Sequence, residues 1–498
     1  MEKPGGFTGF AQGKQYINPF THHINIAVNT NMPSQTTKQG AAGANFLTDG
    51  PVLKALFIIA LPIILSNLLQ SVLDLVDMYF IGKLGDNSIA AGSVSMSVMM
   101  VLLTIVFGLN TAGAAFISRA FGSEKHDRIP VILAHVLYIG LGLGLVIAFI
   151  GAFFTESLLT LMGAEPEVIS EGVKFLQPYL IGSLILIILM ILCTILQSTG
   201  DSKTPMFVMI IVNVVNIALN PTLIQGLWIF PEMGIAGSAF ASLISRSVGI
   251  VLLILAMYYL PSRRDSPIKF PKKWTFEPHL IKDIIFVAIP SAVQSAIRSF
   301  SMLGMNWIVI MYGTAALAAY GICGRLDMLG FILVMGLCTG VAVMVGQNLG
   351  AQKPERAEKA AKYGILINGG FMLVVAVLYL LFASHLVEFF GATDTSLEIG
   401  ISFMQICPLG YFIAAMGMTM GFAMNGAGMT RPGMYAALLG QLGTQLGCAM
   451  LFKLVFDLPI QSIWIAIIIG GCMTCLVDFI FFRHGGWKRN KLNLDARK

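Results

Sequence analysis

Charge is scarce in this chain of 498 residues, since Asp, Glu, Lys and Arg together make up 11% of it. A typical soluble domain carries about 25% charged residues, so the composition excludes an ordinary soluble enzyme. Glycine follows no collagen period, which excludes a fibrous protein. Cysteine is also rare: all seven lie in apolar segments, and we expect no disulfide framework. Cys472 and Cys475 form a C-x-x-C without a second pair or a histidine nearby, so we interpret them as packed small residues.

The chain does contain long apolar segments, and 56% of its residues are hydrophobic. Each segment is long enough to cross a hydrocarbon core of about 30 Å at ~1.5 Å per helical residue. We therefore predict an all-α polytopic membrane protein with twelve transmembrane helices. They lie near residues 54–81, 90–118, 130–154, 171–198, 204–226, 234–259, 280–312, 318–346, 359–384, 399–425, 433–456 and 459–483.

The polar segments divide this array. Residues 1–50 are polar and lack the apolar core of a secretory signal, so we expect a disordered cytoplasmic tail there. An N-lobe of six helices follows at 51–260, and a cytoplasmic inter-lobe loop at 261–279. A C-lobe of six helices occupies 280–484, and a basic cytoplasmic tail occupies 485–498.

The loops between the spans differ in charge. One set is rich in Lys and Arg, and the opposite set carries mainly Glu and Asp. Because basic loops stay on the cytoplasmic side, we expect both termini in the cytoplasm and a multi-pass protein of the plasma (inner) membrane. The net charge of +6 resides largely in these loops, so we expect no nucleic-acid partner. The basic set includes Arg119, Lys125, Arg128, Lys203, Arg263, Arg264, Lys353, Arg356 and Arg431.

The two halves of the chain repeat with a constant offset of 228 residues and no gaps over about 150 residues. The matching pairs include Pro62 and Pro290, Gly85 and Gly313, Arg128 and Arg356, Gly163 and Gly391, and Gly200 and Gly428. Since each copy holds an even number of spans, both copies enter the membrane from the same side. We therefore predict two six-helix lobes related by a pseudo-two-fold axis along the membrane normal.

Ionisable residues inside spans are costly and are functional candidates by default. On the first span, Ser66, Gln70, Asp74 and Asp77 recur at three and four residues, so they share one helix face. That face must look into a cavity or a partner helix. Two carboxylates so close in an apolar setting are expected to titrate as a coupled pair in which the protonated forms are favoured.

The fifth and sixth spans offer a matching surface. Asn213, Asn216 and Asn220 share one face, and Ser238 and Ser242 share another. With the aspartates they could form an oxygen-rich site for a proton or a bare cation, located toward the outer half of the N-lobe. The alternative is that these polar groups only bond helices together, and that Asp74 stays hydrated near the surface.

The second half lacks the carboxylate pair. Asp74 and Asp77 align with Met302 and Met305, and Gln70 aligns with Arg298. We therefore place the anionic site in the N-lobe alone. For the buried charges of the second half, two arrangements stay open: Arg298 pairs with Asp327, or Arg325 lies at the outer rim beside Asp327.

Methionine is abundant, at 28 residues. Met302 and Met305 share one face of the seventh span, and Met420 lies on a methionine face of the tenth. Such methionines are ordinarily core or lipid-facing residues, and the functional alternative is an adaptable substrate wall. Small-residue pairs are present as well. Gly336 with Gly340, and Gly443 with Gly447, form GxxxG pairs that predict close helix contacts.

Several segments together resemble one family. The run from Leu47 to Gly85, GDSKTPM at 200–206, NIALNP at 216–221, GIAGSAFAS at 234–242 and VGQNLGAQKPERAEKAA at 345–361 are similar to MATE (multidrug and toxic compound extrusion) transporters. The resemblance spans roughly 48–490. It implies two six-helix lobes around a central cleft, and export of organic cations and other drugs in exchange for inward H⁺ or Na⁺.

The resemblance also assigns residues. The family's coupling aspartate falls on Asp77 and its fifth-helix asparagine on Asn216. This chain has Asn220 where many members have Asp, and Asp74 where many have Asn. The acidic residues that some members carry on the seventh and tenth helices are absent. We therefore expect cation coupling by six residues and a substrate cleft lined by four others. The first group is Asp77, Asp74, Asn216, Asn220, Ser242 and Gln70, and the second is Met302, Met305, Arg298 and Met420.

Three other functions fit these residues less well than a multidrug antiporter. An intramembrane aspartyl protease needs facing aspartates from separate helices, whereas Asp74 and Asp77 share one helix, and a zinc-binding H-E-x-x-H is absent. A lipid-linked precursor flippase would line its cavity with cations, and Arg298 is isolated. A channel fits the duplicated, one-sidedly acidic cavity less well. We expect no enzyme activity, no resident metal or cofactor beyond the coupling H⁺ or Na⁺, small-molecule drugs and membrane lipid as partners, and a monomer.

Overall fold

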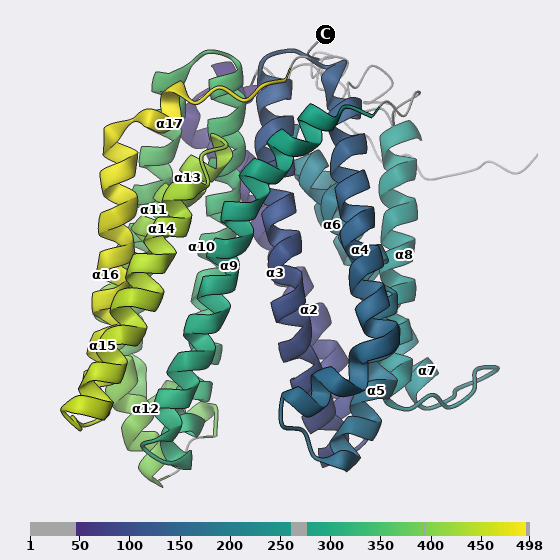
Figure 1. Ribbon diagram of the computed structural model, residues 1–498, viewed down its shortest axis with the longest axis vertical. Helices are drawn as coiled ribbons and strands as arrows, with labels where there is room; N and C mark the ends of the chain where they lie inside the picture. Colours follow the sequence, from purple (N-terminus) through teal and green to yellow (C-terminus); the bar gives the residue numbers. More distant parts are fainter. Residues whose placement is uncertain (1–45, 260–275, 392–393, 495–498) are drawn as a thin grey trace, which may run out of the picture. The chain divides into compact units, whose positions relative to one another are not determined.

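The computed structural model describes residues 46–259, 276–391 and 394–494. The expected tail over residues 1–45 and most of the expected inter-lobe loop lie outside the described residues. Within the described part every regular element is a helix (Figure 1). The first half contains α2 (Val52–Gly82), α3 (Asp86–Gly122), α4 (Arg128–Leu161), α5 (Pro166–Ile181), α6 (Ser183–Ser198), α7 (Lys203–Ile224) and α8 (Ile235–Tyr259).

The second half continues the all-helical pattern. It contains α9 (Pro278–Ile310), α10 (Thr314–Gly350), α11 (Pro354–Phe389), α12 (Asp394–Ile406), η2 (Cys407–Gly410), α13 (Tyr411–Gly426), α14 (Arg431–Ala436), the π-helix η3 (Ala437–Leu446), α15 (Gly447–Met450), the π-helix η4 (Leu451–Val455), α16 (Gln461–His484) and α17 (Gly486–Arg489). The segment from α14 to η4 is one continuous span with shifts in hydrogen-bond register.

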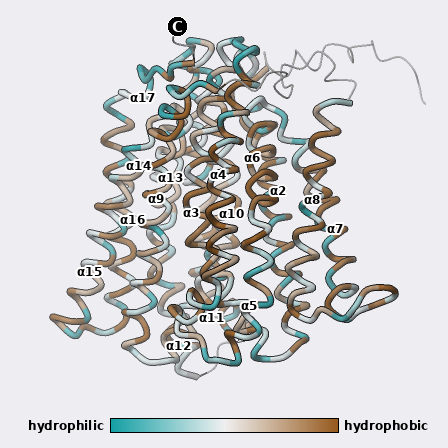
Figure 2. The backbone as a smooth tube through the Cα atoms, turned by 45° about the vertical axis from the view of Figure 1, so that its right-hand side comes forward, coloured by the Kyte–Doolittle hydropathy of each residue, from teal (hydrophilic) through white to brown (hydrophobic). Residues whose placement is uncertain are grey.

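The prediction of twelve spans is confirmed in the described part of the chain. Eleven helices are long and apolar enough to cross a membrane, and the pair α5 and α6, bent by 48° at Gly182, supplies a twelfth. Figure 2 shows hydrophobic residues along the middles of the helices and hydrophilic residues gathered toward their ends. This distribution suits a bilayer, whose hydrocarbon core cannot hydrate polar groups.

The backbone itself repeats with the offset of 228 residues. Glycines that follow equivalent helices have positive φ in both halves, and so does one non-glycine pair. The pairs are Gly85 (114°) with Gly313 (105°), Gly163 (78°) with Gly391 (88°), Gly200 (93°) with Gly428 (77°), and Glu124 (57°) with Gln352 (58°). Equivalent turns therefore close in the same left-handed conformation, which supports the predicted duplication.

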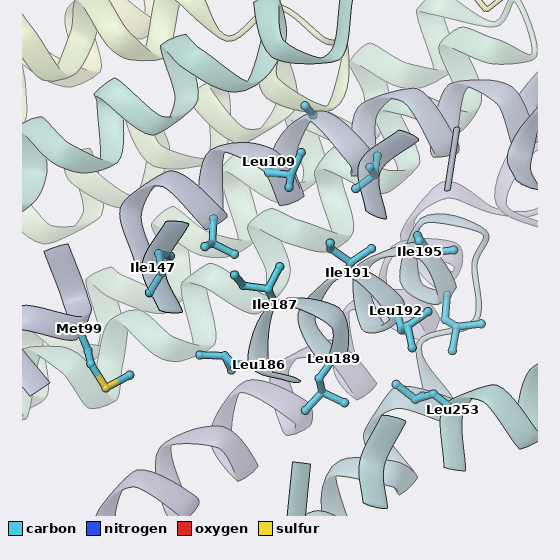
Figure 3. Close-up of a cluster of buried hydrophobic side chains, with 14 of the residues drawn as sticks. Met99, Leu109, Ile147, Leu186, Ile187, Leu189, Ile191, Leu192, Ile195 and Leu253 are labelled. Carbon is cyan, nitrogen blue, oxygen red and sulfur yellow. The ribbon is translucent and has the colours of Figure 1, made fainter. Parts of the chain in front are cut away.

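The helices of each half pack around apolar side chains. Figure 3 shows this packing in the first half, where Leu186, Ile187 and Ile191 of α6 lie among residues such as Leu109 of α3 and Ile147 of α4. Burial of such side chains from water stabilises the core of a soluble protein. In a bilayer, close packing between helices contributes more of the stability. The α6 core thereby holds α3, α4 and α8 in fixed positions relative to one another.

The two halves meet at one end of the bundle, here called the basic end, where α3 and α10 finish. A Cβ added to Gly122 would lie 1.9 Å from the Gln347 carbonyl oxygen, and one on Gly350 would lie 2.3 Å from the Arg119 carbonyl oxygen. No side chain fits at either position, so the α3 and α10 backbones are in direct contact across the halves.

A second contact of the same kind joins α2 to α10. A Cβ on Gly336 would lie 2.4 Å from the Ile64 side chain, and one on Gly340 would lie 3.0 Å from that of Ala60. The close contact predicted for this GxxxG pair is confirmed. The other pair behaves differently, because a Cβ on Gly447 would meet nothing within 4 Å. That prediction is wrong, since Gly447 lies on an open face of α15.

The first and last described segments of the chain are both held by contacts at the basic end. The expected disordered tail over residues 1–50 is too long, because Phe46 to Asp49 form a helical turn and Leu47 is 3% exposed. Arg356 donates hydrogen bonds to the carbonyl oxygens of Leu47 and Gly50. The ordering has a simple cause, since an apolar side chain is buried and the guanidinium binds the free carbonyls of the turn.

The C-terminal segment also crosses between the halves. Trp487 is fully buried beside Phe482, and Lys488 forms an ion pair with Glu358 at 2.5 Å. Arg119 of α3 donates to the Asn490 carbonyl oxygen at 2.7 Å, and Arg128 of α4 donates to that of Leu494 at 2.6 Å. The expected basic tail is therefore a packed strap as far as Leu494.

Candidate functional site

Asp77 occupies the centre of a polar cluster near the end of α2. It is 3% exposed, and it lies five residues before Gly82, roughly 8 Å along the helix from its end opposite the basic end. Its Oδ1 accepts hydrogen bonds from the Nδ2 atoms of Asn220 at 2.7 Å and Asn216 at 3.2 Å. Its Oδ2 accepts one from the Ser242 hydroxyl at 2.5 Å. Three helices thus converge on one carboxylate.

Helical spacing and close backbone contact place these donors. Asn216 and Asn220 are one turn apart on α7, and the Asn220 Nδ2 also bonds to the Asn216 Oδ1 at 2.9 Å. A Cβ on Gly237 would lie 2.6 Å from the Leu223 carbonyl carbon, so the start of α8 packs directly on the end of α7. This contact brings the Ser242 hydroxyl within 3.2 Å of Asn216 Nδ2.

Some polar oxygens of the cluster have no partner. Among the described residues, Asn220 Oδ1 and the Ser238 hydroxyl are buried without a hydrogen bond. A buried polar group left unpaired is costly, so these oxygens are available to a proton donor or a cation. Asn213 donates from Nδ2 to the Met209 carbonyl oxygen of its own helix at 2.8 Å, and it has no hydrogen bond to Asp77 among the described residues.

Asp74 and Gln70 occupy the same face of α2 but not the same cluster. Gln70 Nε2 donates to Asp74 Oδ1 at 3.1 Å, and Asp74 is half-buried. Ser66, further along, bonds to the Pro62 carbonyl oxygen of its own helix at 2.9 Å. The structure therefore assembles Asp77, Asn216, Asn220 and Ser242, and it leaves Asp74 with Gln70 alongside.

Sequence reasoning missed Arg246. It lies one turn after Ser242 on α8, is 2% exposed, and donates a hydrogen bond to the Tyr179 hydroxyl of α5. It acts electrostatically on both Asp74 and Asp77. The signal was present, because an arginine inside the predicted span 234–259 is itself an intramembrane charge.

The second half does not pair Arg298 with Asp327, and the alternative of Arg325 at the outer rim stays a prediction. Asp327 accepts a hydrogen bond from the Tyr411 hydroxyl. Arg298, which is exposed, has Asp478 of α16 as its electrostatic partner. Asp478 is 2% exposed, and its Oδ1 has no hydrogen-bond partner among the described residues. Sequence reasoning overlooked Asp478, although a carboxylate inside the predicted span 459–483 is itself an intramembrane charge.

The three methionines of the expected substrate wall differ in burial. Met302 is 59% exposed, but Met305 and Met420 are 0% and 3% exposed. Met305 belongs to an apolar cluster built mainly from the second half of the chain, and Met420 belongs to a cluster that includes residues of α2 and α10. The two methionines of the seventh span, Met302 and Met305, share a helix face but differ in burial, because positions three residues apart still differ by about 60° around the helix axis and Met305 lies on the packed side.

Comparison with known proteins gives the family. A model described as MatE matches residues 62–222 and again residues 290–450. The chain belongs to the MatE family. The two matches begin 228 residues apart, which confirms the duplication. The chain is therefore a multi-pass membrane transporter of the multidrug efflux family, as the sequence motifs indicated.

Individual MatE relatives agree along most of the chain. It is 26% identical over 446 residues to the probable multidrug resistance protein YoeA of Bacillus subtilis, covering 89% of this chain and 95% of that protein. It is 26% identical over 373 residues to the FAD transporter of Shewanella oneidensis, covering 73% and 80%. The solved structure of MATE in the bent conformation matches with a TM-score of 0.83 at 24% identity, covering 90% and 98%, which shows the fold.

Proposed function

We propose that this MatE protein is a secondary active multidrug antiporter, which exports organic, often cationic, compounds in exchange for inward H⁺ or Na⁺. The observation that carries the proposal is the carboxylate of Asp77, which is buried and bound by donors from α7 and α8. A buried carboxylate with rearrangeable amide and hydroxyl partners suits reversible binding of a small cation.

The chemistry of this site suits exchange. The three donors stabilise the ionised carboxylate, so a proton on Asp77 weakens these hydrogen bonds. The Ser242 hydroxyl can reverse from donor to acceptor, and an amide can turn its oxygen toward a bound Na⁺. Among the described residues, Asn220 Oδ1 of this cluster is buried without a hydrogen-bond partner, and so is Ser238 Oγ, one turn before Ser242 on α8. Cation binding therefore changes contacts among α2, α7 and α8, which is what coupling to a conformational change requires.

Orientation follows from charge. The basic end carries the Lys- and Arg-rich loops and, by the positive-inside rule, is cytoplasmic. The glycine contacts of α3 with α10 close the two halves at that end. In this arrangement the Asp77 cluster lies toward the outside, where external H⁺ or Na⁺ reaches it. We place the protein in the plasma (inner) membrane with both termini cytoplasmic, and a monomer supplies every residue of the site.

The substrate class rests on charge and on relatives. Among the described residues of the second half, the exposed Arg298 has a carboxylate, Asp478, as its electrostatic partner, which argues against the cationic cavity that a pyrophosphate-linked lipid would require. A multidrug substrate range is favoured over a lipid-linked precursor. The name of the Shewanella oneidensis relative shows that anionic cofactors belong among the compounds to be tested.

The decisive test is efflux from proteoliposomes under a pH gradient and, separately, a Na⁺ gradient, for wild-type protein and Asp77→Asn. We expect one of the gradients to drive efflux by the wild type and neither to do so for the variant. Glu156→Gln, an exposed carboxylate in the same lobe, is the matched control and should behave like wild type. Undiminished gradient-driven efflux by Asp77→Asn would overturn the coupling role.

A further inference from the structure

Arg246 is a buried positive charge beside the proposed coupling site. Its side chain is 2% exposed, and its guanidinium carbon lies 5.0 Å from the centre of the Tyr179 ring. The Tyr179 hydroxyl is its hydrogen-bond partner, and its Nε has none among the described residues. A neutral hydroxyl does not compensate a charge, so the guanidinium requires negative charge nearby.

The required charge comes from α2. α2 ends and α8 begins on the side opposite the basic end, so the two helices run in opposite directions past the Ser242–Asp77 hydrogen bond. Arg246 lies one turn after Ser242 and Asp74 lies about one turn before Asp77, so both lie on the same side of that bond. Asp74 and Asp77 both act electrostatically on Arg246. Neither carboxylate forms an ion pair with Arg246 within 4 Å in the part of the chain that the structure describes. Arg246 therefore compensates the charge of a carboxylate without forming a direct ion pair with it. The donors from α7 and α8 remain hydrogen-bonded to Asp77.

Among the described residues, the titratable groups that act on Arg246 are Asp74 and Asp77 of α2 and Tyr179 of α5, while α7 contributes amides to Asp77. With Tyr179 neutral, two carboxylates and one guanidinium sum to one negative charge. Without Arg246 the same site would carry two.

We infer that Arg246 is an internal counter-charge that compensates Asp74 and so limits the site to one coupling cation per transport cycle. This rests on the proposed antiport function and deepens it, because it concerns how many cations are exchanged rather than whether exchange occurs. Arg246 is a positioning residue: it fixes the charge of the site and does not bind the transported cation.

The inference predicts a change in stoichiometry. With the membrane potential clamped at zero, a tenfold gradient of the coupling ion balances a drug gradient of about tenfold for one cation and about 100-fold for two. Arg246→Gln should shift the balance toward the 100-fold value. Arg246→Lys keeps the charge and should retain the wild-type value. Asp74→Asn combined with Arg246→Gln restores one negative charge and should return the balance to about tenfold.

These outcomes distinguish a charge-compensating role of Arg246 from a role in packing. An unchanged balance point in Arg246→Gln, with Asp77→Asn still inactive, would overturn the counter-charge and leave the proposed function standing. Full coupling in Asp77→Asn would instead overturn the proposed function. If Arg246→Gln fails to fold, recovery of folded protein in the double variant supports the counter-charge. Equal failure of the double variant would assign Arg246 to packing with Tyr179 and contradict the inference.

Discussion

The Ser242 hydroxyl on α8 donates a hydrogen bond of 2.5 Å to Asp77 Oδ2 on α2, and it joins residues 165 positions apart in the chain. The same hydroxyl lies 3.2 Å from Asn216 Nδ2 on α7. A single serine thus connects all three helices of the site. Its removal tests whether these contacts work as one unit.

Ser242→Ala should change the affinity for the coupling ion without unfolding the protein. If the ion is H⁺, its binding should tighten, because a donor that stabilises the ionised carboxylate of Asp77 is lost. If the ion is Na⁺, its binding should weaken, because an oxygen ligand is lost. A hydrogen bond to a charged group is worth about 1.5–3 kcal/mol, which corresponds to roughly a 10- to 100-fold change in the half-saturating ion concentration for efflux. Efflux rates measured against ion concentration check this. Ser247→Ala, whose hydroxyl bonds to the Leu243 carbonyl oxygen of its own helix, is the control and should leave the half-saturating concentration near that of wild type.

Gly122→Ala should disturb closure at the basic end. The added Cβ would lie 1.9 Å from the Gln347 carbonyl oxygen, so the two halves must separate there. We expect overpacking to cost about 1–3 kcal/mol and to raise thiol labelling of a cysteine placed at Ser118 by roughly tenfold or more. Gly142→Ala is the matched control, because a Cβ there meets nothing within 4 Å. Equal labelling of both variants would contradict the contact.

Glu277→Gln should lower stability in a pH-dependent manner. Arg128 binds the carboxylate at 2.9 and 2.7 Å, and this hydrogen-bonded pair holds the pKa of Glu277 below its ordinary value of 4.5. A lowered folded-state pKa gives stability that is present above about pH 4.5 and is lost as the pH falls through the folded-state value. The variant should therefore be less stable by about 1–2 kcal/mol at neutral pH.

Thermal unfolding in detergent at neutral pH and below pH 4 measures this effect. The difference between Glu277→Gln and wild type should shrink at the lower pH, because wild-type Glu277 is then increasingly protonated. Glu355→Gln, an exposed acid near the start of α11, is the control and should differ little from wild type at either pH. A difference that persists unchanged in acid would show that the carboxylate charge is not its cause.

The two methionines at 302 and 305 should respond in opposite ways to truncation. Met305→Ala removes a fully buried side chain and should destabilise the protein by about 2–5 kcal/mol, with uniform loss of transport. Met302, which is 59% exposed, should tolerate alanine within about 0.5 kcal/mol and change the relative resistance to different drugs. Thermal unfolding together with growth on a panel of drugs distinguishes the two. Uniform loss of resistance in Met302→Ala would assign that residue to packing.

Much of the fold was readable from local sequence. Hydrophobic length predicts the spans because a bilayer admits only helices of sufficient apolar length, and the constant offset predicts the duplication because each copy folds by the same local rules. Helical periodicity also predicts that Asn216 and Asn220 share a face. These features depend on neighbours within about four residues, so sequence alone determined them.

Tertiary structure decided which groups meet. Both Asp74 and Asp77 lie on the polar face of α2, but only Asp77 receives the donors of α7 and α8, because the packing of Gly237 on α7 sets the position of α8. Packing also brings Arg246 to the aspartates and Asp478 toward Arg298. The rotation of a helix about its axis and its distance from its neighbours are set by side-chain contacts between distant segments. The periodicity within one helix does not predict these contacts.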